Sequence, residues 1–312
     1  MSEPDPPGPI GFIGLGDMGG PIAERLVEAR FKVTVADLRT DAVDQLVAKG
    51  AAAAPSLADI AAGSAILFIC VVNDQQVASL VRQVGPSLAP GSTVVILSSV
   101  KPETMAVVRG LLDDSGRETV DLVDIPVSGS RPAAAAGTLT LMVGGSDASV
   151  DLLRPVLASF SERIFHVGPL GSGQAMKIAN NIVLHMNHLV ALEAVRFARS
   201  QGIDEERFIE VVNVSSGRSW VTETWGLIDG MFRDHPQAGT DGIYAMMVKE
   251  MWSAVLISRG SDCALPLTGL GLQVSREAYA GRERDLGIKR PRAEGRARRA
   301  AARTGRPDKV IS

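Results

Sequence analysis

Cysteine, aromatic residues and long apolar runs are scarce in this chain of 312 residues, and each scarcity excludes a class of protein. Its two cysteines, Cys70 and Cys263, lie too far apart in the sequence to suggest a disulfide framework or a metal centre. No run of 18 apolar residues is present, so no membrane span is expected. The first residues also lack the basic and apolar regions of a secretory signal. We therefore expect a cytoplasmic protein without a metal site.

Positive charge is scarce as well, except at the end of the chain. Segment 282–312 carries 11 Lys or Arg against four Asp or Glu, a net charge of +7, whereas residues 1–281 carry −10. The segment has little apolar periodicity, which predicts a disordered tail. It contains no aromatic residue to stack on bases, so a nucleic-acid partner is not expected.

What the sequence does contain, up to about residue 170, is an alternation of strand and helix patterns. Apolar strand patterns occur at 9–13, 32–37, 65–72, 93–97, 122–125, 139–143 and 163–167, with helical patterns between the earlier ones. The uninterrupted apolar run at 65–72 suits a parallel strand that is covered on both faces. The pattern predicts an α/β fold with a doubly wound, Rossmann-type parallel sheet.

Beyond residue 170 only helical patterns follow. They cover 172–200, 205–214, 222–232, 244–259 and 270–279, and the first is too long for a crossover within a sheet. We therefore predict a dinucleotide-binding domain at 1–170 and an all-α substrate and oligomerisation domain at 171–281. The long helix is expected to link them, and the basic tail occupies 282–312.

A glycine fingerprint follows the first strand. Gly14, Gly16 and Gly19 have the G-x-G-x-x-G spacing that lets a pyrophosphate approach a helix N-terminus. An acid, Asp37, ends the second strand 18 residues later and would bind both adenosine ribose hydroxyls, which favours NAD. Arg39 could instead receive the 2′-phosphate of NADP, and Asp37 could simply cap a turn or a helix.

Small polar residues follow the strand at 122–125. The Ser128 side chain and the backbone N–H groups of Gly129 and Ser130 form a compact donor set that suits a carboxylate, and Arg131 could add positive charge. A plain turn rich in small residues is the alternative interpretation.

The long helix carries one lysine among apolar residues. Lys177 and Asn181 share a face because they are four residues apart. A partly buried ammonium can act as a general acid toward a carbonyl, although Lys177 could also extend along the helix surface to water. His185 and His188 could tune this lysine or be hydrogen-bonded core residues. Trp220 and Trp225 could line a substrate cleft or pack in the core.

These segments, in this order, resemble the β-hydroxyacid dehydrogenase family over roughly residues 8–280. The matching positions of its three motifs are Gly14, Gly16, Met18 and Gly19; Asp124, Pro126, Val127, Ser128, Gly129, Gly137, Thr138 and Leu139; and Gly171, Gly173, Lys177 and Asn181. Two departures stand out. Glu250 replaces the family's aspartate after Lys249, and the usual C-terminal segment is not recognisable beyond Arg282.

The resemblance implies an NAD-dependent oxidoreductase, with NADP as the alternative cofactor. It would interconvert a small β-hydroxy acid and its semialdehyde or keto acid, and it would form a homo-dimer or tetramer. Lys177 would be the catalytic acid/base, Asn181 would orient the substrate oxygen or the lysine, and Ser128, Gly129 and Ser130 would bind the substrate carboxylate. The implied cofactor contacts are Gly14, Leu15, Gly16, Asp17, Met18, Gly19, Asp37, Val71, Val72, Ser99 and Lys249.

Two other functions remain open at this point. An imine-reductase-like enzyme would keep the fold and the cofactor, but such enzymes commonly replace the lysine. A cofactor-binding scaffold without turnover could use the basic tail to contact nucleic acid.

Overall fold

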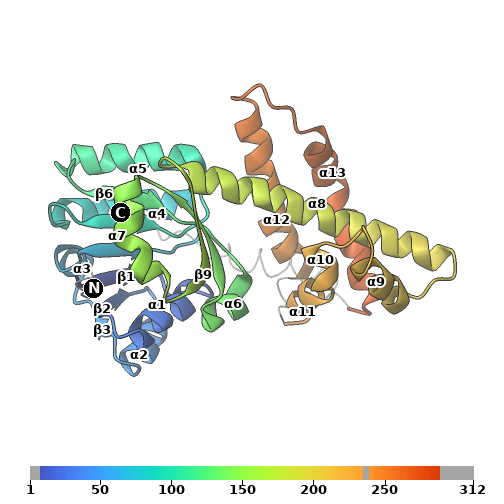
Figure 1. The fold of residues 1–312 in the computed structure, drawn as a ribbon, viewed down its shortest axis with the longest axis horizontal. Helices are drawn as coiled ribbons and strands as arrows, with labels where there is room; N and C mark the ends of the chain where they lie inside the picture. The colour runs from blue at the N-terminus through green and yellow to red at the C-terminus, as the bar shows by residue number, and fades with distance from the viewer. Residues whose placement is uncertain (1–7, 235–238, 289–312) are drawn as a thin grey trace, which may run out of the picture. The chain divides into compact units, whose positions relative to one another are not determined.

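The computed structural model describes residues 8–234 and 239–288 (Figure 1). The chain divides into two compact units, Met1–Asn180 and Asn181–Ser312. Most of the predicted tail, residues 289–312, lies outside the described residues.

One sheet organises the first unit. Its strands run in the order β3-β2-β1-β4-β5-β6-β8-β7, and β9 pairs with β8. Their bounds are β1 Ile10–Ile13, β2 Val33–Ala36, β3 Ala52–Ala53, β4 Ile66–Ile69, β5 Thr93–Ile96, β6 Asp121–Asp124, β7 Val127–Ser128, β8 Leu139–Gly144 and β9 Ser161–Gly168. The predicted Rossmann-type α/β fold is confirmed.

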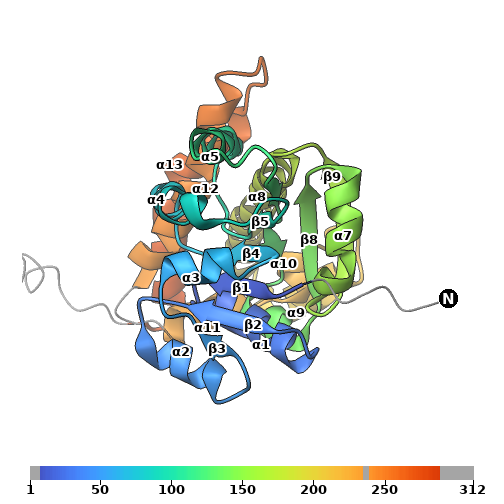
Figure 2. The ribbon, with the colours of Figure 1, turned by 90° about the vertical axis from the view of Figure 1, so that its left-hand side faces the viewer.

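Helices cover both faces of this sheet (Figure 2). They are α1 Gly19–Glu28, α2 Thr40–Val47, α3 Leu57–Ala62, α4 Asp74–Val84, α5 Pro102–Asp114, α6 Ser130–Ala136 and α7 Asp147–Leu157. Along β4, Ile66 and Phe68 join the apolar cluster under α1, α2 and α7, whereas Leu67 and Ile69 join the cluster under α3, α4 and α5. The strand is apolar at every position because both of its faces are buried.

The sheet is parallel from β3 to β6, and beyond β6 it also contains antiparallel pairs, which the strand pattern does not predict. β8 runs antiparallel to β6 and to β7. The chain returns from β7 to β8 through the seven-residue helix α6 and the left-handed Gly137, whose φ is +72°. This connection is shorter than the dozen or more residues that a crossover between parallel strands needs.

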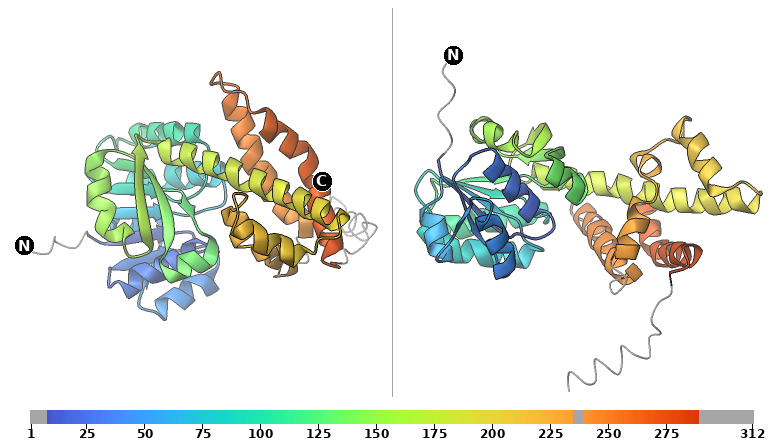
Figure 3. Two further views of the ribbon diagram at one scale, coloured as in Figure 1. Left: turned by 45° about the vertical axis from the view of Figure 1, so that its right-hand side comes forward. Right: turned by 90° about the horizontal axis from the view of Figure 1, so that it is seen from below.

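The second unit is helical in the described residues. Helix α8, Ser172–Ser200, begins in the first unit and continues unbroken into the second (Figure 3). The others are α9 Glu205–Asn213, α10 Trp220–Glu223, α11 Leu227–Asp234, α12 Gly239–Ser258 and α13 Pro266–Asp285. The predicted helix at 222–232 is divided into α10 and α11, because Gly226 between them has a φ of +92°. None of the described helices is long and apolar enough to cross a membrane.

A buried ionic cluster joins α13 to α9 and α11. Arg282, 4% exposed, donates hydrogen bonds to both carboxylate oxygens of Glu205 and to both of Asp229. Its guanidinium lies 5.1 Å from the centre of the Trp225 ring. These hydrogen bonds lower the pKa of Glu205 to about 2. Arg282, the first residue of the predicted disordered tail, therefore belongs to the folded core.

Candidate functional site

The strand ends of the first unit form one row. The parallel register aligns Ala36, Ile13, Ile69, Ile96 and Asp124, which end β2, β1, β4, β5 and β6. The residues that follow these strand ends therefore share one edge of the sheet, where open α/β sheets bind their ligands. Most of the predicted cofactor contacts follow these strands, namely residues 14–19, 37, 71, 72 and 99.

The three fingerprint positions hold glycine for different reasons. A Cβ on Gly14, whose φ is +98°, would collide with the carbonyl oxygen of Cys70, and one on Gly19 would collide with that of Gly14. A Cβ on Gly16 would meet nothing within 4 Å. Gly14 and Gly19 therefore permit close packing of β1, α1 and the β4 loop, while Gly16 leaves open backbone surface that suits a pyrophosphate.

Asp37 is fastened to the same turn. Its Oδ2 accepts a hydrogen bond from the Leu15 N–H at 2.6 Å, and its Oδ1 accepts one from the Arg39 N–H at 2.8 Å. Arg39 in turn donates from Nη2 to the Leu15 carbonyl oxygen at 2.8 Å. The acid that could bind a ribose and the arginine that could bind a 2′-phosphate thus both lie beside the glycine turn.

The turns after β4 and β5 are tied together. The Val71 N–H donates to the Ser98 Oγ at 2.7 Å, and Val72 is 74% exposed beside it. Cys70 packs against the apolar cluster below, and burial raises the pKa of its thiol to about 12. Cys70 is therefore a neutral packing residue rather than a nucleophile.

Asp124 has a role that the sequence analysis did not assign. This buried carboxylate, at the end of β6, accepts the Gly171 N–H at 2.6 Å and the Gln174 N–H at 2.7 Å. Burial raises its pKa, while these hydrogen bonds act in the opposite direction. Asp124 thereby caps the start of α8 and fixes the lysine helix to the sheet. An acid that ends an apolar strand is the only sign of this role in the sequence.

The predicted carboxylate-binding residues lie in and just after β7. Ser128 is half-buried, Gly129 has a φ of +138°, and Ser130 has a φ of +62°. A positive φ at a serine is uncommon and costs conformational energy. The backbone thus turns sharply here, and Gly129, Ser130 and Arg131 are exposed.

Lys177 and Asn181 lie one turn apart on α8, as predicted. Lys177 is half-buried and Asn181 is 4% exposed. Farther along α8, His185 contacts Glu250 of α12, with 2.6 Å between Nε2 and Oε2. Lys249, the remaining predicted cofactor contact, precedes this glutamate and is exposed.

His188 belongs to the core of the second unit. Its Nδ1 lies 2.9 Å from the Tyr279 hydroxyl oxygen, and burial lowers its pKa to about 4. Both helix histidines are thus hydrogen-bonded and buried, which was one of the two alternatives for them.

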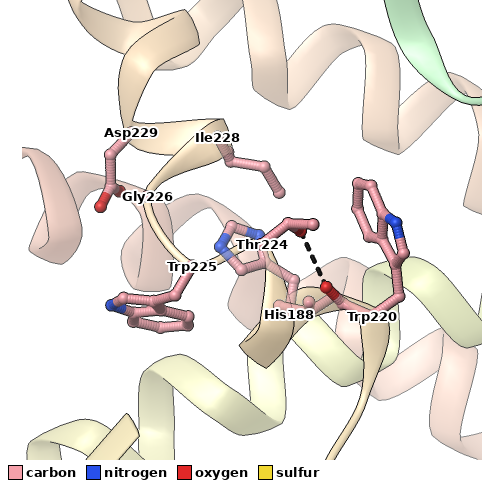
Figure 4. Close-up of a pocket in the computed structure, with 8 residues that line it drawn as sticks. His188, Trp220, Thr224, Trp225, Gly226, Ile228 and Asp229 are labelled. Carbon is pink, nitrogen blue, oxygen red and sulfur yellow. Dashed lines mark hydrogen bonds between the residues drawn. The ribbon is translucent and has the colours of Figure 1, made fainter. Parts of the chain in front are cut away.

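The cavity beside His188 is too small for an organic substrate. Figure 4 shows the indoles of Trp220 and Trp225 on opposite sides of it, and Thr224 donating to the Trp220 carbonyl oxygen. Its volume of about 10 Å³ holds at most one water molecule. The Trp225 Nε1 donates to Glu205 at 2.7 Å, so Trp225 is a structural residue. In the described part of the chain, no three His, Cys, Asp or Glu side chains are grouped to hold a metal ion.

Comparison with known proteins agrees with this geometry. Residues 9–168 match the model of the NAD binding domain of 6-phosphogluconate dehydrogenase. Residues 171–290 match the model described as NAD-binding of NADP-dependent 3-hydroxyisobutyrate dehydrogenase. The chain therefore carries a nicotinamide-dinucleotide-binding domain followed by the helical domain of this group.

Individual relatives extend over almost the whole chain. The NAD-dependent L-serine dehydrogenase of Pseudomonas aeruginosa is 32% identical over 289 residues, which cover 89% of this chain and 95% of that protein. The 2-(hydroxymethyl)glutarate dehydrogenase of Eubacterium barkeri is 34% identical, covering 85% and 87%. A structure of Mycobacterium tuberculosis 3-hydroxyisobutyrate dehydrogenase with L-serine has a TM-score of 0.75 at 25% identity, covering 91% and 96%. The chain thus belongs to the β-hydroxyacid dehydrogenases, NAD(P)-dependent oxidoreductases that act on hydroxyl groups.

Proposed function

We propose that this enzyme interconverts a small β-hydroxy acid and its semialdehyde or keto acid, with Lys177 as the general acid/base. One structural observation carries the proposal. The Asp124 carboxylate ties the start of the helix that bears Lys177 to the sheet edge that bears the glycine turn and Asp37. The names of the relatives, which act on L-serine and 2-(hydroxymethyl)glutarate, support a small hydroxy acid as substrate.

NAD is the proposed cofactor, held by the residues at the carboxyl ends of the strands. Gly16 would receive the pyrophosphate, and Asp37 would accept from the adenosine ribose hydroxyls. The charge of Asp37 disfavours a 2′-phosphate, and the Arg39 guanidinium is already engaged by the Leu15 carbonyl. When bound, the nicotinamide accepts or supplies the hydride.

The side chains of α8 and β7 supply the remaining chemistry. A protonated Lys177 Nζ donates its proton to the carbonyl oxygen during reduction, and the neutral amine removes the hydroxyl proton during oxidation. Asn181 orients that oxygen or the amine. Ser128, with the backbone N–H groups of Gly129 and Ser130, binds the carboxylate and thus presents the reacting carbon in one orientation.

The direct test follows absorbance at 340 nm with NADH or NADPH and a panel of small semialdehydes and keto acids, and with NAD⁺ and L-serine in the reverse direction. Oxidation of NADH by a panel member, faster than that of NADPH, is expected. If no panel member changes the absorbance at 340 nm while NADH binds tightly, the proposed reaction is wrong.

Lys177→Ala tests the role of the lysine. We expect turnover to fall by more than about tenfold with little change in the dissociation constant for NADH, because only the proton transfer loses its donor. Asp114→Ala, at an exposed position near the end of α5, is the control. Full activity, or equal losses of NADH binding and turnover, would contradict the assignment.

We also propose a homo-oligomer, a dimer or tetramer, in the cytoplasm. Val183, Val190 and Phe197 on α8 are 59%, 59% and 69% exposed and recur every seven residues, the spacing of a helix that packs along a partner helix. A second copy of the chain would bury this stripe. Both cysteines are free thiols, which suits a reducing compartment.

A further inference from the structure

Gln174 is a fully buried polar residue whose contacts the proposed reaction does not explain. It lies in the first turn of α8 and is 0% exposed. Its Oε1 accepts a hydrogen bond from the Val100 N–H at 3.0 Å, and its Nε2 donates one to the Ser98 carbonyl oxygen at 2.9 Å. One side-chain amide therefore pairs with the backbone on both sides of Ser99.

This arrangement compensates for the end of a strand. β5 ends at Ile96, and α5 begins at Pro102. Between them the chain leaves the sheet, so its backbone N–H and C=O groups lose their strand partners and need others. A glutamine amide has an N–H donor beside a carbonyl acceptor, as a peptide group does. Gln174 thus takes the place of a neighbouring strand at residues 98–100.

Two further contacts hold the same loop. The Ser98 Oγ accepts from the Val71 N–H at 2.7 Å, and Asp74 accepts from the Lys101 N–H at 2.9 Å. Both tie the loop to the region after β4. Gln174 differs from them because it ties the loop to α8, three residues before Lys177.

The backbone of Gln174 is fixed independently of its side chain. Its N–H donates to Asp124 at 2.7 Å, so the first turn of α8 remains anchored to β6 whatever the side-chain amide does. A change of the amide alone should therefore release the loop at 98–100 and leave the helix start in place.

We propose that Gln174 is a positioning residue for cofactor binding, which acts by holding Ser99 in place relative to the first turn of α8. This inference rests on the proposed function, and it takes Ser99 as one of the predicted cofactor contacts that follow the ends of the strands. Gln174 itself is buried behind the loop, so its effect passes through the backbone at Ser98 and Val100.

The test measures the dissociation constant for NADH by fluorescence, well below the unfolding temperature of each variant. Gln174→Met keeps the side-chain size and removes both hydrogen bonds. We expect its dissociation constant to rise by at least about fivefold. Gln83→Met, at an exposed position on α4, should stay within about twofold of the wild type. A Gln174→Met variant that is less stable but binds NADH like the wild type would overturn the proposal.

A double-mutant cycle with Ser99→Ala tests whether Gln174 acts through Ser99. We expect Ser99→Ala to weaken NADH binding in the wild type and to weaken it much less in Gln174→Met. The proposal is overturned if the dissociation constant of the double variant rises by the product of the two separate effects. It is also overturned if Ser99→Ala binds NADH normally. If Gln174→Met does not fold, Gln174→Asn replaces it, since the amide stays neutral but its shorter side chain does not reach both Val100 and Ser98.

Turnover is not measured in these experiments. A chain that binds NADH but reduces no panel compound would therefore contradict the proposed reaction, and the result for Gln174 would still be decisive.

Discussion

At the scale of single residues, the choice between NAD and NADP rests on Asp37. We expect Asp37→Ala to lower the ratio of kcat/KM for NADH to that for NADPH by at least about tenfold, because the carboxylate that binds the ribose hydroxyls and repels a 2′-phosphate is gone. Asp37 also binds the Leu15 N–H, so its removal could loosen the glycine turn. Such loosening would affect both cofactors alike and would therefore cancel in the ratio. Asp44→Ala, exposed on α2, should leave the ratio unchanged, and an unchanged ratio in Asp37→Ala would refute the role of this acid.

His188 makes the stability of the helical unit depend on pH. Its pKa is about 4 in the folded chain, against an ordinary value of 6.5. Below pH 6.5 the unfolded chain binds a proton that the folded chain does not accept until about pH 4. The contribution of His188 to the free energy of unfolding is therefore complete above pH 6.5. About 3 kcal/mol of stability is lost as the pH drops to about 4.

Tryptophan fluorescence can measure this effect selectively. All three tryptophans, Trp220, Trp225 and Trp252, belong to the second unit. Urea unfolding at pH 7.5 and pH 4.5 should show the loss in the wild type and a smaller loss in His188→Gln. Glu205 does not interfere, because its own contribution is lost only between its ordinary pKa of 4.5 and its folded value of about 2. Equal losses in the two proteins would exclude His188 as the source.

The sequence predicts the residues of short motifs better than it predicts their contacts. The glycine spacing and Asp37 are close together in the chain, and the structure places them in contact through Leu15. The partners of Asp124 and Gln174 lie 47 to 76 residues away, so no local pattern reveals these hydrogen bonds. The same holds for Glu250, whose carboxylate meets His185 across two helices.

At the scale of elements, the start of α8 depends on one carboxylate. We expect Asp124→Ala to lower the free energy of unfolding by about 2 kcal/mol, because two buried N–H groups of the first turn lose their acceptor. Hydrogen exchange at the backbone N–H of Gln174 should be faster in this variant than in Asp114→Ala. Unchanged stability together with unchanged exchange would show that the helix start does not need this cap.

The long, strongly patterned elements were predictable, and the short ones were not. β1, β4 and β5 are buried along their whole length, β2 buries every second residue, and α8 has a long helical pattern. α3 and α6 have six and seven residues and are rich in alanine, which gives little periodicity. The reversed direction of β8 depends on the pairing of distant strands, which the pattern of a single strand does not contain.

At the scale of the whole molecule, the exposed stripe on α8 predicts self-association. We expect Val190→Glu to shift the protein toward a smaller species in light scattering coupled to size-exclusion chromatography, because a charge in a buried helix seam is costly. Val47→Glu on α2, at a residue that is 40% exposed outside the stripe, is the matched control. A wild type that is already monomeric, or a Val190→Glu variant with unchanged mass, would contradict the proposal.

The division of the molecule follows from a change in pattern that the sequence makes plain, from alternating strands and helices to helices alone. The sequence does not show where the folded chain continues beyond that pattern. The sequence predicts Arg282 to be the first residue of a basic tail, yet its charge is neutralised by Glu205 and Asp229 in the interior. A count of charges cannot distinguish an internal ion pair from a solvated one.

We expect the three fingerprint glycines to be under different evolutionary constraints. Gly14 and Gly19 are required by the packing of the chain itself, because any larger residue collides with backbone. Gly16 faces open space, so an alanine there is tolerated by the fold and obstructs only a ligand. In a lineage that ceased to use a dinucleotide, purifying selection would relax at Gly16 first, while its two neighbours would persist for as long as the protein folds.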